Sequence, residues 1–222
     1  MRTTNSIKLT GIDYNLVKVE TEVSNGIGIH LVGLADQAVK ESLLRTITAM
    51  QANGYRIPGK RIIINLAPAE LSKDGSVYDL PIALGLLAES GQEELPYIES
   101  FVVVGELGLD GSVRAVPGVV QAVQAAVDNG FGVIIPRANT AEVQGLFDYK
   151  PIYPVSNLAE AIAVAKTLKG AMEPEEYESK PKSYGWDSIV GNDGAKRALE
   201  IAVAGGHNVF MMGVPGSGRH AL

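Results

Sequence analysis

The sequence predicts an α/β fold, an α+β sandwich with a mixed sheet, from three observations. Extended segments rich in β-branched residues dominate residues 1–34. Short apolar runs then alternate with segments whose apolar residues recur every three or four positions, as expected for strands that alternate with helices. Gly, Asn and Pro separate most of these segments, as turns and helix ends require. An antiparallel start followed by strand–helix alternation is typical of a mixed α/β sandwich.

The first segments, IKL, NLVKVETEV and GIGIHLVGL, predict an opening antiparallel sheet over residues 1–34. A helix is expected over residues 36–53, between Asp36 as a plausible N-cap and Gly54. Apolar residues recur there at steps of four, four and three, which indicates one buried helical face: Val39, Leu43, Ile47 and Met50.

A strand–loop–helix unit follows. The run RIIINL at residues 61–66 is a short apolar strand candidate. The segment YDLPIALGLLAESG then predicts a helix with Asp79 at its cap and Pro81 in its first turn.

The strand–helix alternation continues to the end of the first predicted domain. FVVVGEL predicts a strand, and the hairpin signal Asp110-Gly111 predicts that SVRAV pairs with it. A helix over residues 117–129 should stop at Gly130. The remaining elements expected are a strand (GVIIP), a short helix (NTAEVQGL), an edge strand containing Pro (KPIYPV) and a closing helix (NLAEAIAVAKTLKG).

A domain boundary is expected at residues 170–186, where Glu, Lys and Pro dominate and apolar periodicity vanishes. This divides the chain into a domain at 1–169, a linker, and a second segment at 187–222. The second segment predicts a helix at about 193–204, an apolar strand at 208–212 and a glycine-rich turn in which the chain ends.

Composition favours a globular protein of the cytoplasm. The chain has no cysteine, three histidines and no apolar run approaching a membrane span or signal peptide. The histidines, His30, His207 and His220, lack metal-ligand spacing, so no metal site is expected. The net charge of −6 gives no overall attraction to DNA or to an anionic membrane.

The local exception is a basic cluster around QANGYRIPGKR, formed by Arg45, Arg56, Lys60 and Arg61. The simpler interpretation is a solvated helix end and turn. The alternative is a contact with nucleic acid through phosphate groups.

The C-terminal turn GVPGSGRH follows a predicted strand, which is the context of a phosphate-binding loop. Of the pattern G-x-x-x-x-G-K-S/T, Gly213 and Gly218 are in place, whereas Arg219 and His220 replace the Lys and the Ser/Thr. Backbone amides of residues 214–218, including Gly216 and Ser217, could still cradle an anion. Arg219 keeps a positive charge, but an imidazole is a poor ligand for Mg²⁺, which prefers oxygen. A flexible tail is the alternative.

Longer motifs point to a family. The segment VGNDGAKRALEIAVAGGHNVFMMGVPGSG resembles the lead-in to the P-loop of magnesium chelatases and ComM/YifB-type AAA+ ATPases. VGLADQAVKESLLR and INLAPAELSKDGSVYDLPIALGLL resemble the N-terminal domain of the same family. The resemblance covers essentially the whole chain. It implies a Lon-protease-like, ribosomal-protein-like first domain and a AAA+ module truncated within its P-loop.

The Lon-like resemblance allows a test for protease residues. Lon enzymes carry P-K-D-G-P-S-A-G with a nucleophilic Ser, and G-G-x-K-E-K with a Lys that acts as base. Alignment on Lys73-Asp74-Gly75 places Val77 at the nucleophile, and GSVRAVPGVVQAV places Val120 at the Lys. Valine has no nucleophilic or titratable atom, so the dyad cannot form. Ser76 is a weak substitute nucleophile, and Lys73, Asp74 and Asp79 are then interpreted as turn and helix-cap residues.

The leading hypothesis is therefore a regulatory or substrate-handling N-terminal domain of a ComM-like ATPase. The resemblance implies ATP and Mg²⁺ as cofactors of the parent family, self-association into a ring, and a role in DNA branch migration and recombination during competence. We expect this chain to bind neither cofactor tightly and to be neither ATPase nor protease by itself. The alternatives are a magnesium-chelatase-type assembly factor and, disfavoured by the valines, a Lon-like peptidase.

Overall fold

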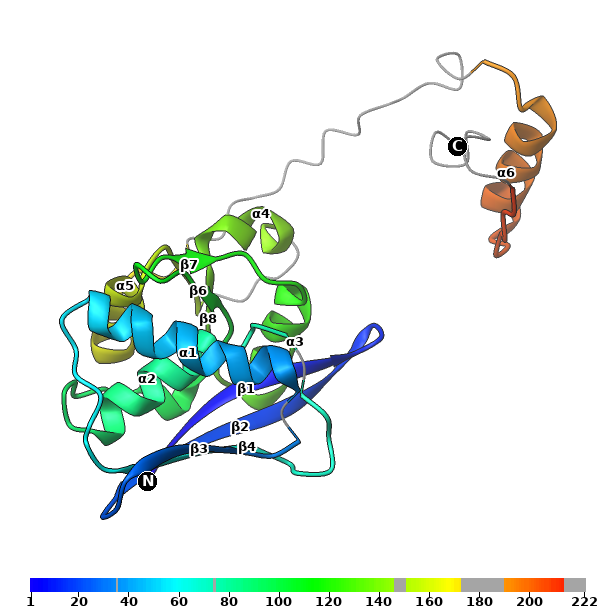
Figure 1. Ribbon diagram of the computed structural model, residues 1–222. Coiled ribbons are helices and arrows are strands. Elements are labelled where there is room, and N and C mark those ends of the chain that lie inside the picture. Colours follow the sequence, from blue (N-terminus) through cyan, green and yellow to red (C-terminus); the bar gives the residue numbers. More distant parts are fainter. Residues whose placement is uncertain (35, 74, 146–150, 173–189, 214–222) are drawn as a thin grey trace. The chain divides into compact units, whose positions relative to one another are not determined.

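The computed structural model describes residues 1–34, 36–73, 75–145, 151–172 and 190–213. The chain divides into two compact units, 1–177 and 178–222, and each is described by itself (Figure 1).

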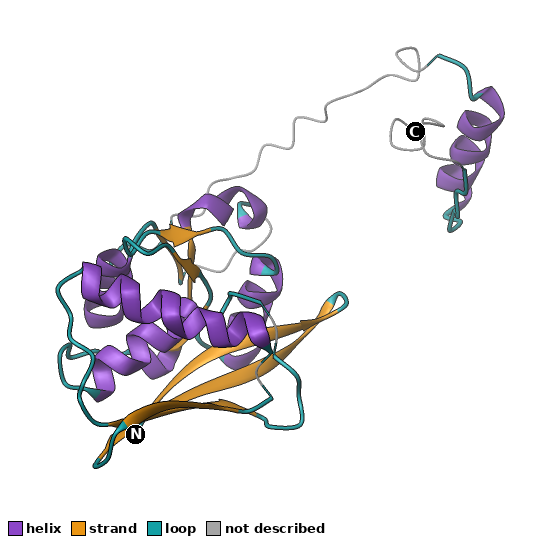
Figure 2. Ribbon diagram, in the orientation of Figure 1, coloured by secondary structure: helices purple, strands orange, loops and turns teal. Residues whose placement is uncertain are grey.

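The first unit is built on a seven-stranded mixed sheet with the order β3-β4-β2-β1-β5-β8-β9 (Figures 1 and 2). The pairs β1–β2 and β2–β4 are antiparallel, and the pairs β3–β4, β1–β5, β5–β8 and β8–β9 are parallel. The strands are β1 (Arg2–Thr10), β2 (Asp13–Ser24), β3 (Gly28–Val32), β4 (Arg61–Ala67), β5 (Phe101–Val103), β8 (Gly132–Pro136) and β9 (Ile152–Val155). The α/β class predicted from the sequence is confirmed.

The opening antiparallel sheet is only partly as predicted. β1 and β2 form the expected antiparallel hairpin, but β3 pairs with β4 in parallel at the edge of the sheet. The physical reason is the helix between them: α1 (Gln37–Ala52) carries the chain back to the same end of the sheet, so that β4 must run parallel to β3.

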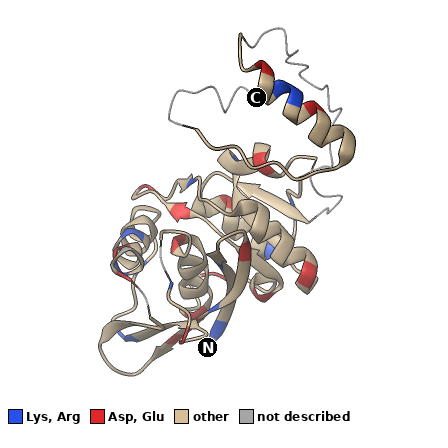
Figure 3. Cartoon of the chain, turned by 90° about the vertical axis from the view of Figure 1, so that its right-hand side faces the viewer, with Lys and Arg blue, Asp and Glu red and all other residues tan. Residues whose placement is uncertain are grey.

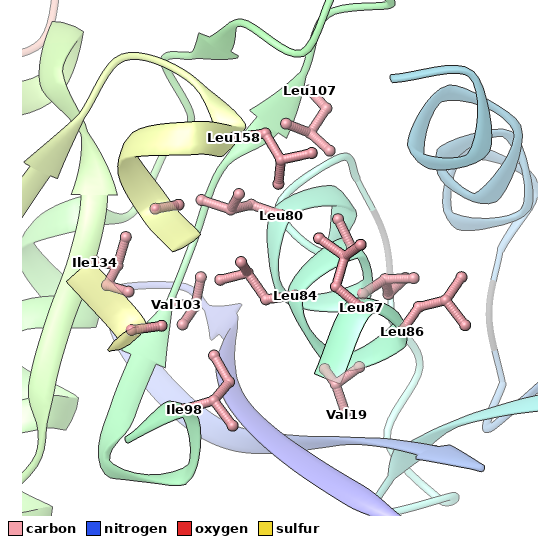
Figure 4. Packing of buried hydrophobic residues seen from close by; sticks show 14 of the residues in the cluster. Val19, Leu80, Leu84, Leu86, Leu87, Ile98, Val103, Leu107, Ile134 and Leu158 are labelled. Carbon is pink, nitrogen blue, oxygen red and sulfur yellow. The ribbon is translucent and has the colours of Figure 1, made fainter. Parts of the chain in front are cut away.

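Helices cover both faces of the sheet around β5 and β8. Val103 and Ile134 pack in one hydrophobic cluster with α2 (Asp79–Glu89) and α5 (Leu158–Thr167), as Figure 4 shows. Their neighbours Val102 and Val133 belong to a second cluster with α3 (Val119–Asn129). Successive strand residues therefore point to opposite faces and are buried on both, as in a layered α/β fold. α1 lies on the same side as α2 (Figure 1).

Several predicted helix ends are confirmed. The Asp36 side chain accepts a hydrogen bond from the Val39 amide at 2.8 Å. Gly130 ends α3 in the left-handed region, with φ of 69°. The hairpin at Asp110-Gly111 is formed by β6 (Glu106–Leu107) and β7 (Val113–Arg114). The single strand predicted as FVVVGEL is divided into β5 and β6.

The remaining elements of the first unit are short. They are η1 (Ile98–Ser100), η2 (Arg137–Asn139) and α4 (Thr140–Val143), where one short helix was predicted for the last two. β9 forms the edge of the sheet and contains Pro154, as predicted.

The assignment of Asp79 as a helix cap is wrong. α2 starts after Tyr78, and the Asp79 carboxylate makes no cap hydrogen bond. It instead turns towards α1, where Ser42 and Thr46 are fully buried beside the predicted apolar stripe. These polar residues were missed because their burial depends on the acid supplied by another helix.

In the second unit the described residues form α6 (Asp193–Gly205), close to the predicted range of 193–204. The strand predicted at 208–212 is not formed among the described residues. Phe210 and Met212 are about nine-tenths exposed. A strand needs a neighbour to satisfy its backbone groups, and the described part of this unit supplies none.

Candidate functional site: a pocket beside two valines

A pocket of about 460 Å³ lies beside the C-terminal half of β1. It is lined by Ile7, Lys8, Leu9, Gly75, Ser76, Val77, Tyr78 and Pro117. The pocket lies where β1 and β5 are parallel neighbours and the strand order reverses. β2, which follows β1, lies towards one edge of the sheet, and β8, the next strand of this sheet after β5, lies towards the other edge. Such a switch point, at the carboxyl ends of parallel strands, is the usual ligand site of an open α/β sheet.

Val77 is held at this switch point by its backbone. Its carbonyl accepts a hydrogen bond from the Gly105 amide at 3.2 Å, two residues beyond the end of β5. The Gly105 carbonyl in turn accepts from the Leu80 amide at 3.1 Å, in the first turn of α2. The half-buried Val77 side chain packs against both hydrophobic clusters. The side chain at the position predicted to align with the Lon nucleophile thus lines the pocket and contributes only carbon.

Val120 lies in the first turn of α3, just after the pocket residue Pro117. Gly118, between them, has φ of 83° and lies so close to the Leu9 side chain that an added Cβ would meet it at 2.6 Å. This close approach fixes the start of α3 against β1. Val120 packs against the same second cluster as Val77. The two positions predicted to align with the Lon dyad therefore contact one common hydrophobic cluster, and neither valine has a titratable group.

Ser76 directly precedes Val77 and carries an aliphatic hydroxyl. Its Oγ donates to Oε2 of Glu106 on β6, and Oε1 of Glu106 is paired with Arg114 at 3.4 Å. Glu106 is a member of this site that sequence reasoning missed, because its pairing with Ser76 depends on the loop before α2 meeting the β6–β7 hairpin. The serine is thus engaged with a carboxylate that also balances an arginine.

Lys73 and Asp74, two other residues of this loop, are predicted turn residues. The structure gives Lys73 a different role. Lys73 is fully buried, and its ammonium donates to the Pro68 carbonyl. Burial lowers the pKa of Lys73. Its backbone also pairs with the segment between β3 and α1, since the Lys73 amide donates to the Leu34 carbonyl and the Asp36 amide to the Lys73 carbonyl, both at 3.1 Å. Asp74 lies outside the described residues.

Asp79 is a buried acid between two helices and a strand. Arg45 donates to it from Nε at 2.9 Å and from Nη2 at 3.2 Å, Ser42 donates its hydroxyl, and the Leu107 amide donates at 3.1 Å. Burial raises the pKa of Asp79, and these hydrogen bonds act in the opposite direction. The carboxylate is fully occupied, which marks it as a structural group.

The structure separates the predicted basic cluster into two parts. The Arg45 side chain is 25% exposed and is committed to Asp79. Arg56, Lys60 and Arg61 are exposed around the start of β4, where Arg61 donates to the Ser24 hydroxyl at 3.3 Å. Acidic and basic residues are interspersed over the ribbon in the view of Figure 3. A phosphate contact, if formed here, would depend on these three residues.

Most of the predicted phosphate loop lies outside the described residues. Gly213 is described and exposed, whereas Gly216, Ser217, Gly218, Arg219 and His220 are not described. Within the described ranges, no group of three or more His, Asp or Glu side chains is placed to hold a metal ion. No helix in the described part of the chain is long and apolar enough to cross a membrane.

Comparison with family models gives two matches. A model described as subunit ChlI of Mg-chelatase matches residues 19–139, and a second, described as magnesium chelatase, subunit ChlI, matches residues 185–222. One match lies in each unit.

Individual proteins extend the same similarity. YifB of Salmonella typhimurium is 37% identical over 215 residues, and the competence protein ComM of Haemophilus influenzae is 36% identical over 221 residues. Both matches cover 96% of this chain but only 42% and 43% of the relative, so the chain spans less than half the length of these proteins. An archaeal Lon protease from Methanocaldococcus jannaschii is 28% identical over 150 residues, which are 66% of this chain and 22% of that protein.

Proposed function

The chain belongs to the ComM/YifB-like magnesium chelatase family, and we propose that its first unit is a regulatory or substrate-handling domain of a ComM-like AAA+ ATPase. The observation that carries this proposal is the pocket at the β1–β5 switch point, beside which Val77 provides only an apolar wall. A site in which valine stands at both predicted dyad positions suits binding and not bond cleavage.

A Lon-like ancestry for this unit is part of the proposal. It is supported by the similarity to the archaeal Lon protease and by the packing of Val77 and Val120 against one apolar cluster. The same residues argue against a peptidase. Ser76 does not replace the lost nucleophile, because its hydroxyl donates to the Glu106 carboxylate and is not held by an amine base.

The second unit is proposed to be the start of the ATPase module. The family implies that the parent protein uses ATP with Mg²⁺. In this sequence the donor set does not fit Mg²⁺ well, since His220 stands where a hydroxyl is expected and Arg219 where a lysine is expected. This chain is therefore not proposed to carry out nucleotide chemistry by itself.

The proposals that DNA is a partner and that the parent protein forms a ring rest only on membership of the family. The name of the Haemophilus relative connects that protein with competence. We propose that the parent of this chain assembles as a ring and acts in DNA branch migration and recombination, in the cytoplasm. Arg56, Lys60 and Arg61 are the residues of the first unit best placed to meet a phosphate backbone.

A second candidate is a magnesium-chelatase-type assembly factor that uses ATP to remodel a metal-inserting partner. It is favoured by the descriptions of both family models. The match to a Lon protease and the high coverage by ComM and YifB favour the first candidate.

A chimaera tests the proposed function. Residues 1–222 are joined to the part of Haemophilus ComM that follows its matching segment, with Arg219→Lys and His220→Thr to restore the phosphate loop. The control is the same ATPase module without residues 1–169. ATP hydrolysis and processing of a four-way DNA junction are measured for both. We expect both proteins to hydrolyse ATP and only the chimaera to respond to the junction. Equal responses of the two proteins would contradict a substrate-handling role.

A further inference from the structure

The two edges of the seven-stranded sheet are built differently. β9, at one edge, contains Pro154, which has no N–H for pairing with a further strand. Two of its carbonyls are also occupied, because the Met172 amide donates to Ile152 at 2.6 Å and Arg137 donates to Pro154 at 2.9 Å. Proline and covering contacts of this kind keep a sheet edge from pairing with another chain. β9 is therefore a protected edge.

β3, at the other edge of the sheet (Figure 1), has no such protection among the described residues. Its sequence is GIHLV, with neither a proline nor a Lys, Arg, Asp or Glu. In a parallel pair, every second residue of a strand directs its N–H and C=O away from the partner strand. Within the described ranges, no backbone hydrogen bond reaches β3 from outside its pairing with β4. This edge is therefore open to a further strand.

The side chains of β3 leave apolar surface at the open edge. Ile29 and Leu31 pack against the main hydrophobic cluster but are only half-buried. On the opposite face of the strand, His30 is exposed and Val32 is 49% exposed. Ile27, directly before the strand, is 90% exposed. Apolar surface on both faces of an open edge marks a place where another chain adds to the sheet.

The two ends of this edge differ in charge. Gly28, at the start of β3, is level with Arg61 on β4, and both Arg61 and the preceding Lys60 are exposed. Beyond the other end, the loops that follow β3 and β4 hydrogen-bond to each other, and they carry Asp36 and the exposed Glu70. The edge therefore starts basic and ends acidic. An antiparallel neighbour with the same order of charges would bring unlike charges together at both ends, and a second copy of this chain is such a neighbour.

We propose that β3 binds β3 of a second copy of this chain in antiparallel orientation, across a two-fold axis at His30. With the two strands fully overlapped, Ile29 of each copy faces Leu31 of the other, and Gly28 faces Val32. The two sheets then form one continuous sheet. A two-fold contact closes on itself, whereas a ring needs a head-to-tail contact. The interface therefore goes beyond the proposed ring, because it joins chains in pairs.

Single cysteines can locate the axis, because the chain has no cysteine of its own. Facing residues of an antiparallel pair have Cβ atoms roughly 4.5–5.5 Å apart, close to the reach of a disulfide. His30→Cys should therefore give a disulfide-linked dimer on mild oxidation. Val32→Cys is the matched control on the same face, because its two copies would lie four residues apart along the strands, about 13 Å. Equal crosslinking of the two variants, or no crosslinking of a folded His30→Cys variant, would overturn the proposal.

Sedimentation velocity gives an independent measurement without a crosslink. Residues 1–222 should show a reversible monomer–dimer equilibrium in a concentration series up to about 1 mM. His30→Lys opposes two lysines at the axis and should raise the Kd of the dimer by about fivefold or more. Gln51→Lys adds the same charge at an exposed position of α1 and should leave the Kd unchanged. Circular dichroism melts establish that the variants fold. A chain that stays monomeric, or a dimer that tolerates both lysines equally, would refute the assignment.

The order of charges along the edge gives a third measurement. Lys60→Glu places like charges together at both ends of the pair and should weaken the dimer, and the addition of Glu70→Lys should recover most of the loss. Rising salt should weaken the dimer of the unaltered chain for the same reason. Equal weakening by the single and the double variant would contradict the antiparallel orientation. The response of the ComM chimaera to a four-way junction does not require this contact, so the proposed function and the dimer can fail separately.

Discussion

Arg45 on α1 and Asp79 at the start of α2 are joined by two hydrogen bonds, of 2.9 and 3.2 Å. Asp79 has no exposed surface, and the Arg45 side chain is 25% exposed. This pair fixes the start of α2, directly after the loop from Gly75 to Tyr78 that lines the pocket. It also commits the Arg45 side chain to a buried partner instead of surface recognition.

Replacing Asp79 by alanine should therefore destabilise the first unit. Removing one partner of a buried pair leaves the other charge uncompensated, at a cost of about 3 kcal/mol in the free energy of unfolding. The matched control is Arg137→Ala, which breaks the exposed pair with Glu160 and should cost less than about 1 kcal/mol. Urea unfolding measures both. A smaller loss for Asp79→Ala than for Arg137→Ala would show that the buried pair does not hold α2 in place.

The chain should have no peptidase activity. Val77 and Val120 provide neither nucleophile nor base, and Ser76 is hydrogen-bonded to Glu106. We expect no cleavage of unfolded casein and no labelling by a fluorophosphonate probe, with an archaeal Lon protease as the positive control. Val77→Ser should also remain unlabelled, because it restores a hydroxyl without a base. A peptide map that locates the probe on Ser76 of the unaltered chain would overturn this prediction.

Residues 1–222 should not hydrolyse ATP. Phosphoryl transfer in P-loop enzymes requires a Lys, a hydroxyl ligand for Mg²⁺, an acidic residue of the next strand and groups that orient water. The sequence offers the glycines with Arg219 and His220. Arg219→Lys with His220→Thr should create no turnover in this chain, but it should in the ComM chimaera. Calorimetry that detected tight, Mg²⁺-dependent ATP binding to residues 1–222 would refute the claim.

Any binding of nucleic acid by the first unit should be weak and sensitive to salt. The exposed cations Arg56, Lys60 and Arg61 could neutralise only a few phosphates at once. Double charge reversal, Arg56→Glu with Lys60→Glu, should abolish the binding seen at low salt in an anisotropy titration. Lys40→Glu with Lys169→Glu changes the net charge equally at other exposed positions and should have less effect. Equal effects of the two double variants would dismiss the basic cluster as a specific contact.

The proposed boundary between the units can be tested by limited proteolysis. The segment at 170–186 lacks the apolar periodicity that packs the flanking helices, so trypsin should cut there first. Mass spectrometry should then find a persistent fragment ending within this segment. Early cuts within α1 or α3 would argue against a stable first domain.

The sequence by itself determined most elements of this protein and its family. Helical periodicity located α1, α3 and α6, and local caps such as Asp36 set their ends, because these signals depend on neighbours within a few residues. The two valines were found in the same way, from motifs that can be read along the chain.

Tertiary structure alone decided the relations between distant segments. The parallel pairing of β3 with β4 depends on the path of α1. The burial of Ser42 and Asp79 depends on contact between α1 and α2. The pocket depends on the end of β1 meeting the loop that carries Val77 and the residue Pro117, which are far apart in the sequence. No periodicity encodes these relations, because they arise when residues far apart in the chain share one core and must satisfy each other's polar groups.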